Sequence, residues 1–351
     1  MHNFISIVFN LCPINQISTA TKMKAMSTIS LHASTDGISC ARFTPSSSKL
    51  LVTTWDGGVT LYDVASGLMS SRAEANGPVL CGAVDPRSDG VVYSGGLDRV
   101  VNMWDVQSGK ALEAIGSHEN GVRCMEWAAL NNTLVTGGWD SCVRVWDTRT
   151  RQTSQQAQIT IRASSKIFAM DVHESHVAIG QQDGTVRIYD VKKADAPVID
   201  RVSTLGHQIR CLRYFDKGTG LASGSTEGRV ALENTGVNVS VKRYTFKCHR
   251  ANEKIYPVNC LAFNPVATTI FATGGGDGSV SVWDEKAQKR LYCLDHFPTS
   301  ISSCEFSHDG TLLAVAVSYT FERGNVDHPV DELLVFSHDR ELEEAQKNEE
   351  A

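Results

Sequence analysis

The chain repeats one short pattern of apolar and polar positions. In Leu50–Asp63, two runs of apolar and β-branched residues flank the turn Asp56-Gly57, and the second run ends with the aromatic-acid pair Tyr62-Asp63. Apolar runs of this length joined by Asp-Gly are typical of a tight β-hairpin. The hairpin recurs at 91–105, 134–147, 177–190, 221–233, 271–284 and, in degenerate form, 312–336. These repeats predict an all-β fold.

The copies follow one another at a nearly constant spacing. The acids that end successive hairpins, from Asp63 to Glu233, lie 42, 42, 43 and 43 residues apart, and the step to Asp284 is 51. A period of roughly 40–45 residues with four strands per unit is the signature of WD40 propeller blades. The sequence therefore resembles WD40 proteins, and we predict a single closed ring of seven blades.

The segments at the two ends set the expected domain boundaries. Residues 1–27 do not match the repeat and are expected to be a disordered leader, with translation from Met23 or Met26 as an alternative. A signal peptide is disfavoured because no Lys or Arg precedes the apolar run 5–14. Thr28–His32 alternates in polarity and is expected to complete the last blade, which closes the ring. We place the propeller at 28–338 and an acidic tail, disordered or a frayed helix, at 339–351.

Composition and cysteine positions exclude several classes of protein. No apolar run approaches the roughly 20 residues that span a bilayer, and the net charge of −6 gives no general affinity for nucleic acid. Five of the ten cysteines share one repeat-equivalent position: Cys40, Cys81, Cys124, Cys211 and Cys260. Equivalent positions in different blades are too far apart for disulfides, so these residues indicate small buried hydrophobes in a reducing compartment. No Cys/His spacing suggests zinc, and we expect no metal, cofactor or membrane contact.

Recurring polar residues have a structural explanation. In the third blade, His118, Thr136, Asp140 and Trp146 match the hydrogen-bonded tetrad of WD40 blades. A buried polar network has to be fully satisfied, so the fold itself constrains these residues. We therefore assign His118 to the architecture rather than to catalysis, and expect a related structural part for His207.

No residue cluster indicates an enzyme. The run Gly274–Gly278 resembles a phosphate loop, but it lacks the following Lys-Ser/Thr and lies where every blade has its turn. GxSxG, HExxH and EF-hand patterns do not occur. We predict a non-enzymatic protein.

The fifth repeat carries a basic island on an acidic chain. We expect an insert at 234–256 between this repeat and the sixth blade's inner strand. The island contains Arg229, Lys242, Arg243, Lys247, Arg250 and Lys254 against Glu233 and Glu253, a net charge of +4 that leaves −10 for the remainder. This imbalance favours an anionic partner surface, with a solvated loop as the alternative.

Residues just before the turn acids differ between repeats. Trp55 and Trp139 stand there in the first and third repeats, whereas the others carry Leu97, Gln182, Thr226 and Gly276. In WD40 proteins this end of the hairpin opens on the top face, the usual partner-binding face. The tryptophans are either binding anchors, because Trp dominates interface hot spots, or rings that pack over their own blades.

Several segments resemble a known WD40 family. They are Thr54–Gly57, Ser94–Asp98, Thr136–Asp140, Glu227–Ala231, Tyr244–Arg250, Ile255–Asn259 and Phe297–Ile301. The chain resembles the spindle-checkpoint WD40 proteins of the budding-uninhibited-by-benzimidazole group, whose paralogues are the messenger-RNA-export WD40 factors. Both branches share the Phe-Lys-Cys-His-Arg element, whereas Ile255–Asn259 and Asp327-His-Pro329 favour the checkpoint branch.

This resemblance implies a mitotic adaptor. Family members bind a GLEBS segment of a checkpoint kinase or its relative across the top face, and Trp55, Trp139 and Arg229 match the contact residues. Checkpoint members also bind a phosphorylated Met-Glu-Leu-Thr motif of the kinetochore scaffold, a role we carry over to Lys247 and Arg250. The resemblance implies a monomeric propeller in hetero-complexes, in the nucleus and at kinetochores with a cytoplasmic pool, without direct nucleic-acid contact.

Two other functions stay open at this level. One is a nuclear-pore adaptor for messenger-RNA export that binds a nucleoporin GLEBS segment. The other is a generic propeller subunit of another complex. The sequence departs from its relatives at Asn234-Thr235 and in the long polar loop 319–331, which leaves the boundary of the seventh blade open.

Overall fold

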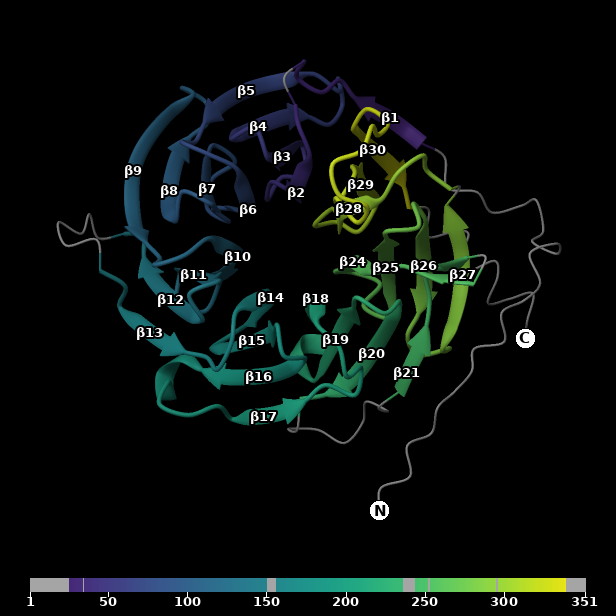
Figure 1. Cartoon of the computed structure of the whole chain (residues 1–351). Coiled ribbons are helices and arrows are strands. Elements are labelled where there is room, and N and C mark those ends of the chain that lie inside the picture. Colours follow the sequence, from purple (N-terminus) through teal and green to yellow (C-terminus); the bar gives the residue numbers. More distant parts are fainter. Residues whose placement is uncertain are drawn as a thin grey trace.

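The computed structural model describes residues 25–33, 35–149, 156–235, 244–251, 253–294 and 296–338. Seven four-stranded antiparallel sheets stand around a central axis, and the first strand of each lies nearest that axis (Figure 1). The predicted all-β seven-bladed ring is confirmed. The first three blades contain β2 (Ile38–Phe43), β3 (Lys49–Thr54), β4 (Gly58–Asp63) and β5 (Met69–Glu74); β6 (Val79–Val84), β7 (Val91–Gly96), β8 (Val100–Asp105) and β9 (Lys110–Ser117); β10 (Val122–Ala128), β11 (Thr133–Gly138), β12 (Cys142–Asp147) and β13 (Ile159–Arg162).

The other blades repeat this order, with two short 3-10 turns between strands. They contain β14 (Ile167–His173), β15 (His176–Gln181), β16 (Thr185–Asp190), η1 (Val191–Lys193) and β17 (Ile199–Val202); β18 (Ile209–Phe215), η2 (Asp216–Gly218), β19 (Gly220–Ser225), β20 (Arg229–Asn234) and β21 (Tyr244–Lys247); β24 (Val258–Phe263), β25 (Ile270–Gly275), β26 (Val280–Asp284) and β27 (Lys289–Leu294); β28 (Ile301–Phe306), β29 (Leu312–Val317) and β30 (Glu332–Ser337). In the part of the chain that the structure describes, no helix is long and apolar enough to cross a membrane.

The N-terminal strand closes the ring. β1 (Ala25–Ile29) pairs antiparallel with β30, with Ile29 opposite Leu333, and so supplies the outer strand of the seventh blade. This closure was predicted from the alternating polarity of Thr28–His32, although the strand begins earlier, at Ala25. Of the predicted leader 1–27, residues 25–27 belong to β1 and 1–24 lie outside the described residues, as does the acidic tail 339–351.

The segment 234–256 is not simply an insert, as the sequence suggested. It contains β21, the outer strand of the fifth blade, which pairs with β20, and the small hairpin of β22 (Arg250–Ala251) and β23 (Lys254–Ile255). The outer strand escaped prediction because the extra residues of this repeat lie after it, around the β22–β23 hairpin, whereas the insert was expected directly after Glu233. Lys242 and Arg243 lie outside the described residues.

Glycines on the second strands let neighbouring blades pack closely. A Cβ atom at Gly95 would lie 2.6 Å from Val122 of the next blade, and Gly274 would meet Ile301 at 2.5 Å. The clusters between blades are apolar and buried; one contains Leu51, Leu61 and Val92, all with no exposed surface. Burial of each sheet against both neighbours makes the ring rigid, and this rigidity fixes the side chains that line the central channel.

Candidate functional site

The second residue of every inner strand lines the top mouth of the central channel. These seven repeat-equivalent residues are Ser39, Leu80, Arg123, Phe168, Arg210, Asn259 and Ser302. Together with Ile38, Trp55, Trp139, Tyr319, Thr320 and Phe321 they enclose a space of about 350 Å³, which we call the mouth cavity. Its volume lies within the usual range for ligand pockets.

The two tryptophans line the mouth cavity from the first and third blades. Trp55 is 39% exposed, and its ring centroid lies 6.4 Å from that of Phe321 in the seventh-blade loop. Trp139 is partly buried, with its ring 6.0 Å from Phe168 of the fourth blade, and its buried Nε1 has no hydrogen-bond partner among the described residues. Each ring therefore reaches a neighbouring blade rather than packing only over its own. Both line the mouth cavity.

Two arginines occupy the floor of this cavity. Arg210 donates a hydrogen bond from Nη2 to Asn259 Oδ1 at 2.9 Å. Burial and the nearby Arg123 lower the pKa of the Arg210 guanidinium. Neither arginine forms a salt bridge with any described residue. Glu322 opposes this lowering of the Arg210 pKa without forming an ion pair. Partly buried guanidiniums that form no salt bridge favour an anionic ligand, which they hold through charge-assisted hydrogen bonds.

Sequence reasoning missed these arginines, although a signal was present. Arg123 and Arg210 are the middle residues of Val122-Arg-Cys and Ile209-Arg-Cys, segments that attracted attention only for their cysteines. The flanking positions are uniformly apolar or small, whereas the middle position varies from Ser to Phe to Arg. Variation at one position of a repeat marks a surface that the fold does not dictate.

A second basic feature surrounds the top turn of the fifth blade, and we call Arg229, Lys247 and Arg250 the basic cluster. Lys247 lies directly opposite Arg229 in the ladder between β20 and β21, a pairing of like charges that destabilises a sheet. Arg250 donates from Nη2 to the carbonyl of Glu227 at 2.9 Å, and the buried Nε of Arg229 has no partner among the described residues. This arrangement favours an anion between the three side chains.

Glycine is required at the centre of that turn. Gly228 has φ = +58°, and a Cβ there would lie 2.7 Å from the carbonyl oxygen of Cys248 and 2.8 Å from that of Tyr256. Cys248 also donates its N–H to the carbonyl of Gly228 at 3.0 Å. The close crossing of these segments brings Lys247 and Arg250 to the same turn as Arg229.

The four residues assigned to the third-blade tetrad form one buried network. His118 Nε2 and the indole N–H of Trp146 both contact Thr136 Oγ1, at 2.8 and 2.9 Å, and His118 Nδ1 lies 3.0 Å from Asp140 Oδ1. Burial lowers the pKa of His118. Although burial opposes it, the hydrogen bond from His118 holds the pKa of Asp140 well below its usual range. Both ring nitrogens of His118 are used within the blade.

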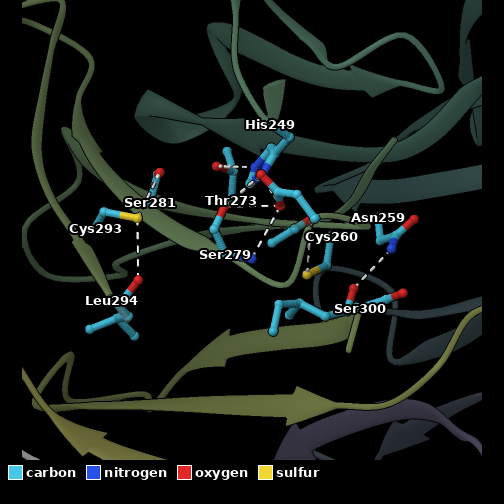
Figure 2. A network of polar contacts seen from close by, with 12 residues as sticks. His249, Asn259, Cys260, Thr273, Ser279, Ser281, Cys293, Leu294 and Ser300 are labelled. Carbon is cyan, nitrogen blue, oxygen red and sulfur yellow. Dashed lines mark hydrogen bonds and ion pairs between the residues drawn. The ribbon is translucent and has the colours of Figure 1, made fainter. Parts of the chain in front are cut away.

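The sixth blade has an equivalent network that the sequence reading missed. Its centre is His249, which contacts Thr273 Oγ1 at 2.9 Å, Asp277 Oδ1 at 2.9 Å and Ser279 Oγ at 3.1 Å (Figure 2). Trp283 donates its indole N–H to Thr273 at 3.0 Å. His249 lies in the Phe-Lys-Cys-His-Arg element, 24 residues before Thr273, whereas His118 precedes Thr136 by 18. The intervening β22–β23 hairpin hid the correspondence.

His207 does not have the structural part expected of it. Its side chain is about half exposed and lies 2.9 Å from Glu227 at the top of the fifth blade. The fifth blade has Ser223 and Glu233 where the third has Thr136 and Trp146, so the tryptophan of a tetrad is missing there.

Below the mouth, five charged side chains cross the channel, and we call them the channel network. Arg42 pairs with Glu126 and lies 3.7 Å from Glu305, while Arg213 lies 3.0 Å from Glu126 and 3.9 Å from Asp171. Buried Glu305 Oε2 has no hydrogen-bond partner among the described residues. Three carboxylates thus face two guanidiniums. The network connects five blades across the axis.

Comparisons with known proteins agree with this architecture. The family model of the WD domain, G-beta repeat, matches residues 24–63 and 240–284, and that of the nucleolar protein 10-like N-terminal domain matches 83–240. The solved structure of U3-55K has a TM-score of 0.76 at 18% identity, covering 89% of this chain and 98% of that one. This likeness concerns the fold alone.

Relatives that match most of the chain include mitotic checkpoint proteins and an RNA export protein. The mitotic checkpoint protein bub3 of Dictyostelium discoideum is 42% identical over 309 residues, covering 86% of this chain and 91% of the relative. BUB3.1 of Arabidopsis thaliana is 39% identical, with 86% and 90% covered. A poly(A)+ RNA export protein of Schizosaccharomyces pombe is 32% identical, with 82% and 83% covered. The chain belongs to the Bub3 family of mitotic checkpoint WD40 proteins.

Proposed function

We propose that this protein is a non-enzymatic adaptor of the spindle checkpoint. It holds a GLEBS segment of a checkpoint kinase across the mouth cavity and at Arg229, and a phosphothreonine motif of a kinetochore scaffold at Lys247 and Arg250 of the basic cluster. By binding both, it recruits the kinase to unattached kinetochores. This function places the protein in the nucleus and at kinetochores, with a cytoplasmic pool.

The mouth cavity is the observation that carries this proposal. It combines two tryptophans, from the first and third blades, with two arginines that form no salt bridge with any described residue. Aromatic anchors and arginines are the residue types that dominate protein interfaces. A segment with apolar side chains around acidic residues complements such a surface in both shape and charge.

The first test is a titration of a kinase-type and a nucleoporin-type GLEBS peptide against the protein and its Trp139→Ala variant. Removing a central tryptophan should cost at least ~2 kcal/mol, which is roughly 30-fold in affinity. Leu112→Ala, at a side chain 50% exposed on outer strand β9, is the matched control and should bind as the parent does. Absence of binding to both peptides would refute the proposal.

Preference for the nucleoporin peptide would favour the export function instead. The export function is retained as a second candidate because the chain is 32% identical to the poly(A)+ RNA export protein. Depletion of the protein separates the two functions: premature anaphase supports the checkpoint role, and nuclear accumulation of polyadenylated RNA supports export.

The phosphopeptide role rests on Lys247 and Arg250. We expect tighter binding of a phosphorylated than of an unphosphorylated Met-Glu-Leu-Thr peptide, and Lys247→Ala should remove most of that difference. Loss of one charge-assisted hydrogen bond costs about 1.5–3 kcal/mol, or roughly 10- to 150-fold. Lys254→Ala, at an exposed lysine of β23, is the control. A variant that keeps the full preference would remove Lys247 from this role.

A further inference from the structure

One side chain at the mouth cavity has an unfavourable backbone conformation. Phe321 lies in the loop 319–331, which connects the second and third strands of the seventh blade. Its φ is +60°, in the left-handed region, and its ring is 46% exposed. A bulky residue with this φ is rare, because its Cβ crowds the backbone. Glycine would form the same turn without that strain.

The surrounding rings hold Phe321 in one place. Its centroid lies 5.3 Å from Tyr319, 6.3 Å from His328 and 6.4 Å from Trp55. Tyr319 is buried, and its hydroxyl accepts the N–H of Arg323 at 2.8 Å and donates to the carbonyl of Gly324 at 3.0 Å. The exposed ring is therefore pre-organised rather than left over from a poorly packed loop.

Polar contacts anchor the loop to the rest of the top face. Glu322 accepts a hydrogen bond from Ser300 Oγ at 2.9 Å, and Asp331 accepts the N–H of Gly37 at 2.8 Å. Asn259 accepts from Arg210 at 2.9 Å and donates to Thr320 Oγ1 at 3.4 Å. Through Asn259, Thr320, the neighbour of Phe321, is thus linked by hydrogen bonds to Arg210 of the mouth cavity.

The stability of the fold does not explain why a phenylalanine occupies position 321. The ring contributes little to the buried core, and it occupies a position where a smaller residue is favoured. In otherwise well-packed proteins, residues with a strained backbone are found mainly at ligand-binding sites. Phe321 combines such strain with exposure, fixed orientation and a place on the wall of the mouth cavity.

We propose that Phe321 is a partner-contact residue. With Trp55 it forms a continuous aromatic wall on the seventh-blade side of the mouth cavity. This wall packs against an aliphatic or aromatic side chain of the bound segment, next to the acidic residue that Arg210 holds. The inference rests on the proposed GLEBS-binding function and adds a rule for the partner: an apolar residue has to adjoin its acidic one.

The test uses Phe321→Gly and Phe321→Asn, because both residues tolerate positive φ. Each variant is titrated with the kinase-type GLEBS peptide, and its melting temperature is measured beside that of the parent. We expect affinity to fall about 10-fold or more, in the range of an interface hot spot, while the melting temperature is unchanged or higher. Phe321→Leu should keep part of the affinity, and Leu112→Ala should keep all of it.

A peptide variant tests the partner side. Replacing the apolar residue beside the acidic one with alanine should weaken binding to the parent protein but hardly change binding to Phe321→Gly, since that contact is already lost. Equal peptide affinity of the parent, Phe321→Gly and Phe321→Asn would overturn the inference, as would a lower melting temperature in both variants. If the parent does not bind the peptide, the proposed function fails; if it binds and only Trp139→Ala weakens binding, the inference alone fails.

Discussion

Replacing Glu305 with glutamine is expected to stabilise the propeller near pH 8 by about 2 kcal/mol and to change little near pH 5. Burial raises the pKa of the Glu305 carboxyl to about 7, although Arg42 and Arg213 oppose this shift. The gap from the ordinary value of 4.5 corresponds to about 3 kcal/mol at most. We expect less because the side chain is 21% exposed to the channel.

The sign follows from proton uptake. Between pH 4.5 and about 7 the folded protein holds a proton on Glu305 that the unfolded chain has released. The free energy of unfolding contributed by this group therefore falls as the pH rises through that window and is level above it. Glutamine is neutral at every pH and removes this decline. Burial also raises the pKa of Asp171, to about 6, so the variant keeps a shallower pH dependence.

Glu126→Gln is the matched comparison, and its effect should have the opposite sign. Glu126 lies between Arg42 and Arg213, so its loss leaves two guanidiniums without their shared partner. Breaking such a pair costs about 3–5 kcal/mol. Urea unfolding of both variants and the parent at two pH values measures these effects. Stabilisation by Glu126→Gln, or a pH-independent effect of Glu305→Gln, would contradict this account of the channel network.

Asp277→Ala is expected to weaken both the fold and phosphopeptide binding. Although burial opposes it, the hydrogen bond from His249 holds the pKa of Asp277 below its usual range. Removing the carboxylate leaves buried His249 without its charged partner, which should cost about 3 kcal/mol of stability. His249 lies between Lys247 and Arg250 in the chain, so its displacement moves both basic side chains.

Asp140→Ala is the control that separates these two effects. It removes the same interaction from the third blade, where His118 has no link to the basic cluster. Thermal unfolding should show comparable destabilisation for both variants. Titration of the phosphorylated Met-Glu-Leu-Thr peptide, well below both melting temperatures, should show weaker binding only for Asp277→Ala. If the two variants bound the phosphorylated peptide with equal affinity, the sixth-blade tetrad would not position the phosphopeptide site.

The features that could be predicted from the sequence are those set by residues close together in the chain. Hairpins such as Leu50–Asp63 carry their own turn and periodicity, so the number of blades and the closure by the N-terminal strand were accessible. The basic residues of the fifth repeat were recognised in the same way. That Lys247 lies opposite Arg229, however, depends on the register between β20 and β21, and the interpretation of 234–256 as an insert concealed that pairing.

The contacts that were not predicted join residues from different blades, which come together only when the ring closes. Arg123 and Arg210 lie in different blades, and only the closed ring directs both into one cavity. The same holds for Arg42 and Glu126, 84 residues apart in the chain. Phe321 was part of a loop with no repeat pattern, and its exposure and backbone angle have no signature in composition. Contacts across the axis therefore require the three-dimensional structure.

The pairing of β1 with β30 also bears on how the protein is made. Ile29 meets Leu333 only after almost all of the described chain has left the ribosome. Until then β1 has no partner, and the nascent propeller exposes open strand edges that can pair with other chains. Such long-range pairing is slow, and exposed edges favour aggregation. Synthesis of this protein should therefore depend on chaperones that shield an unfinished ring.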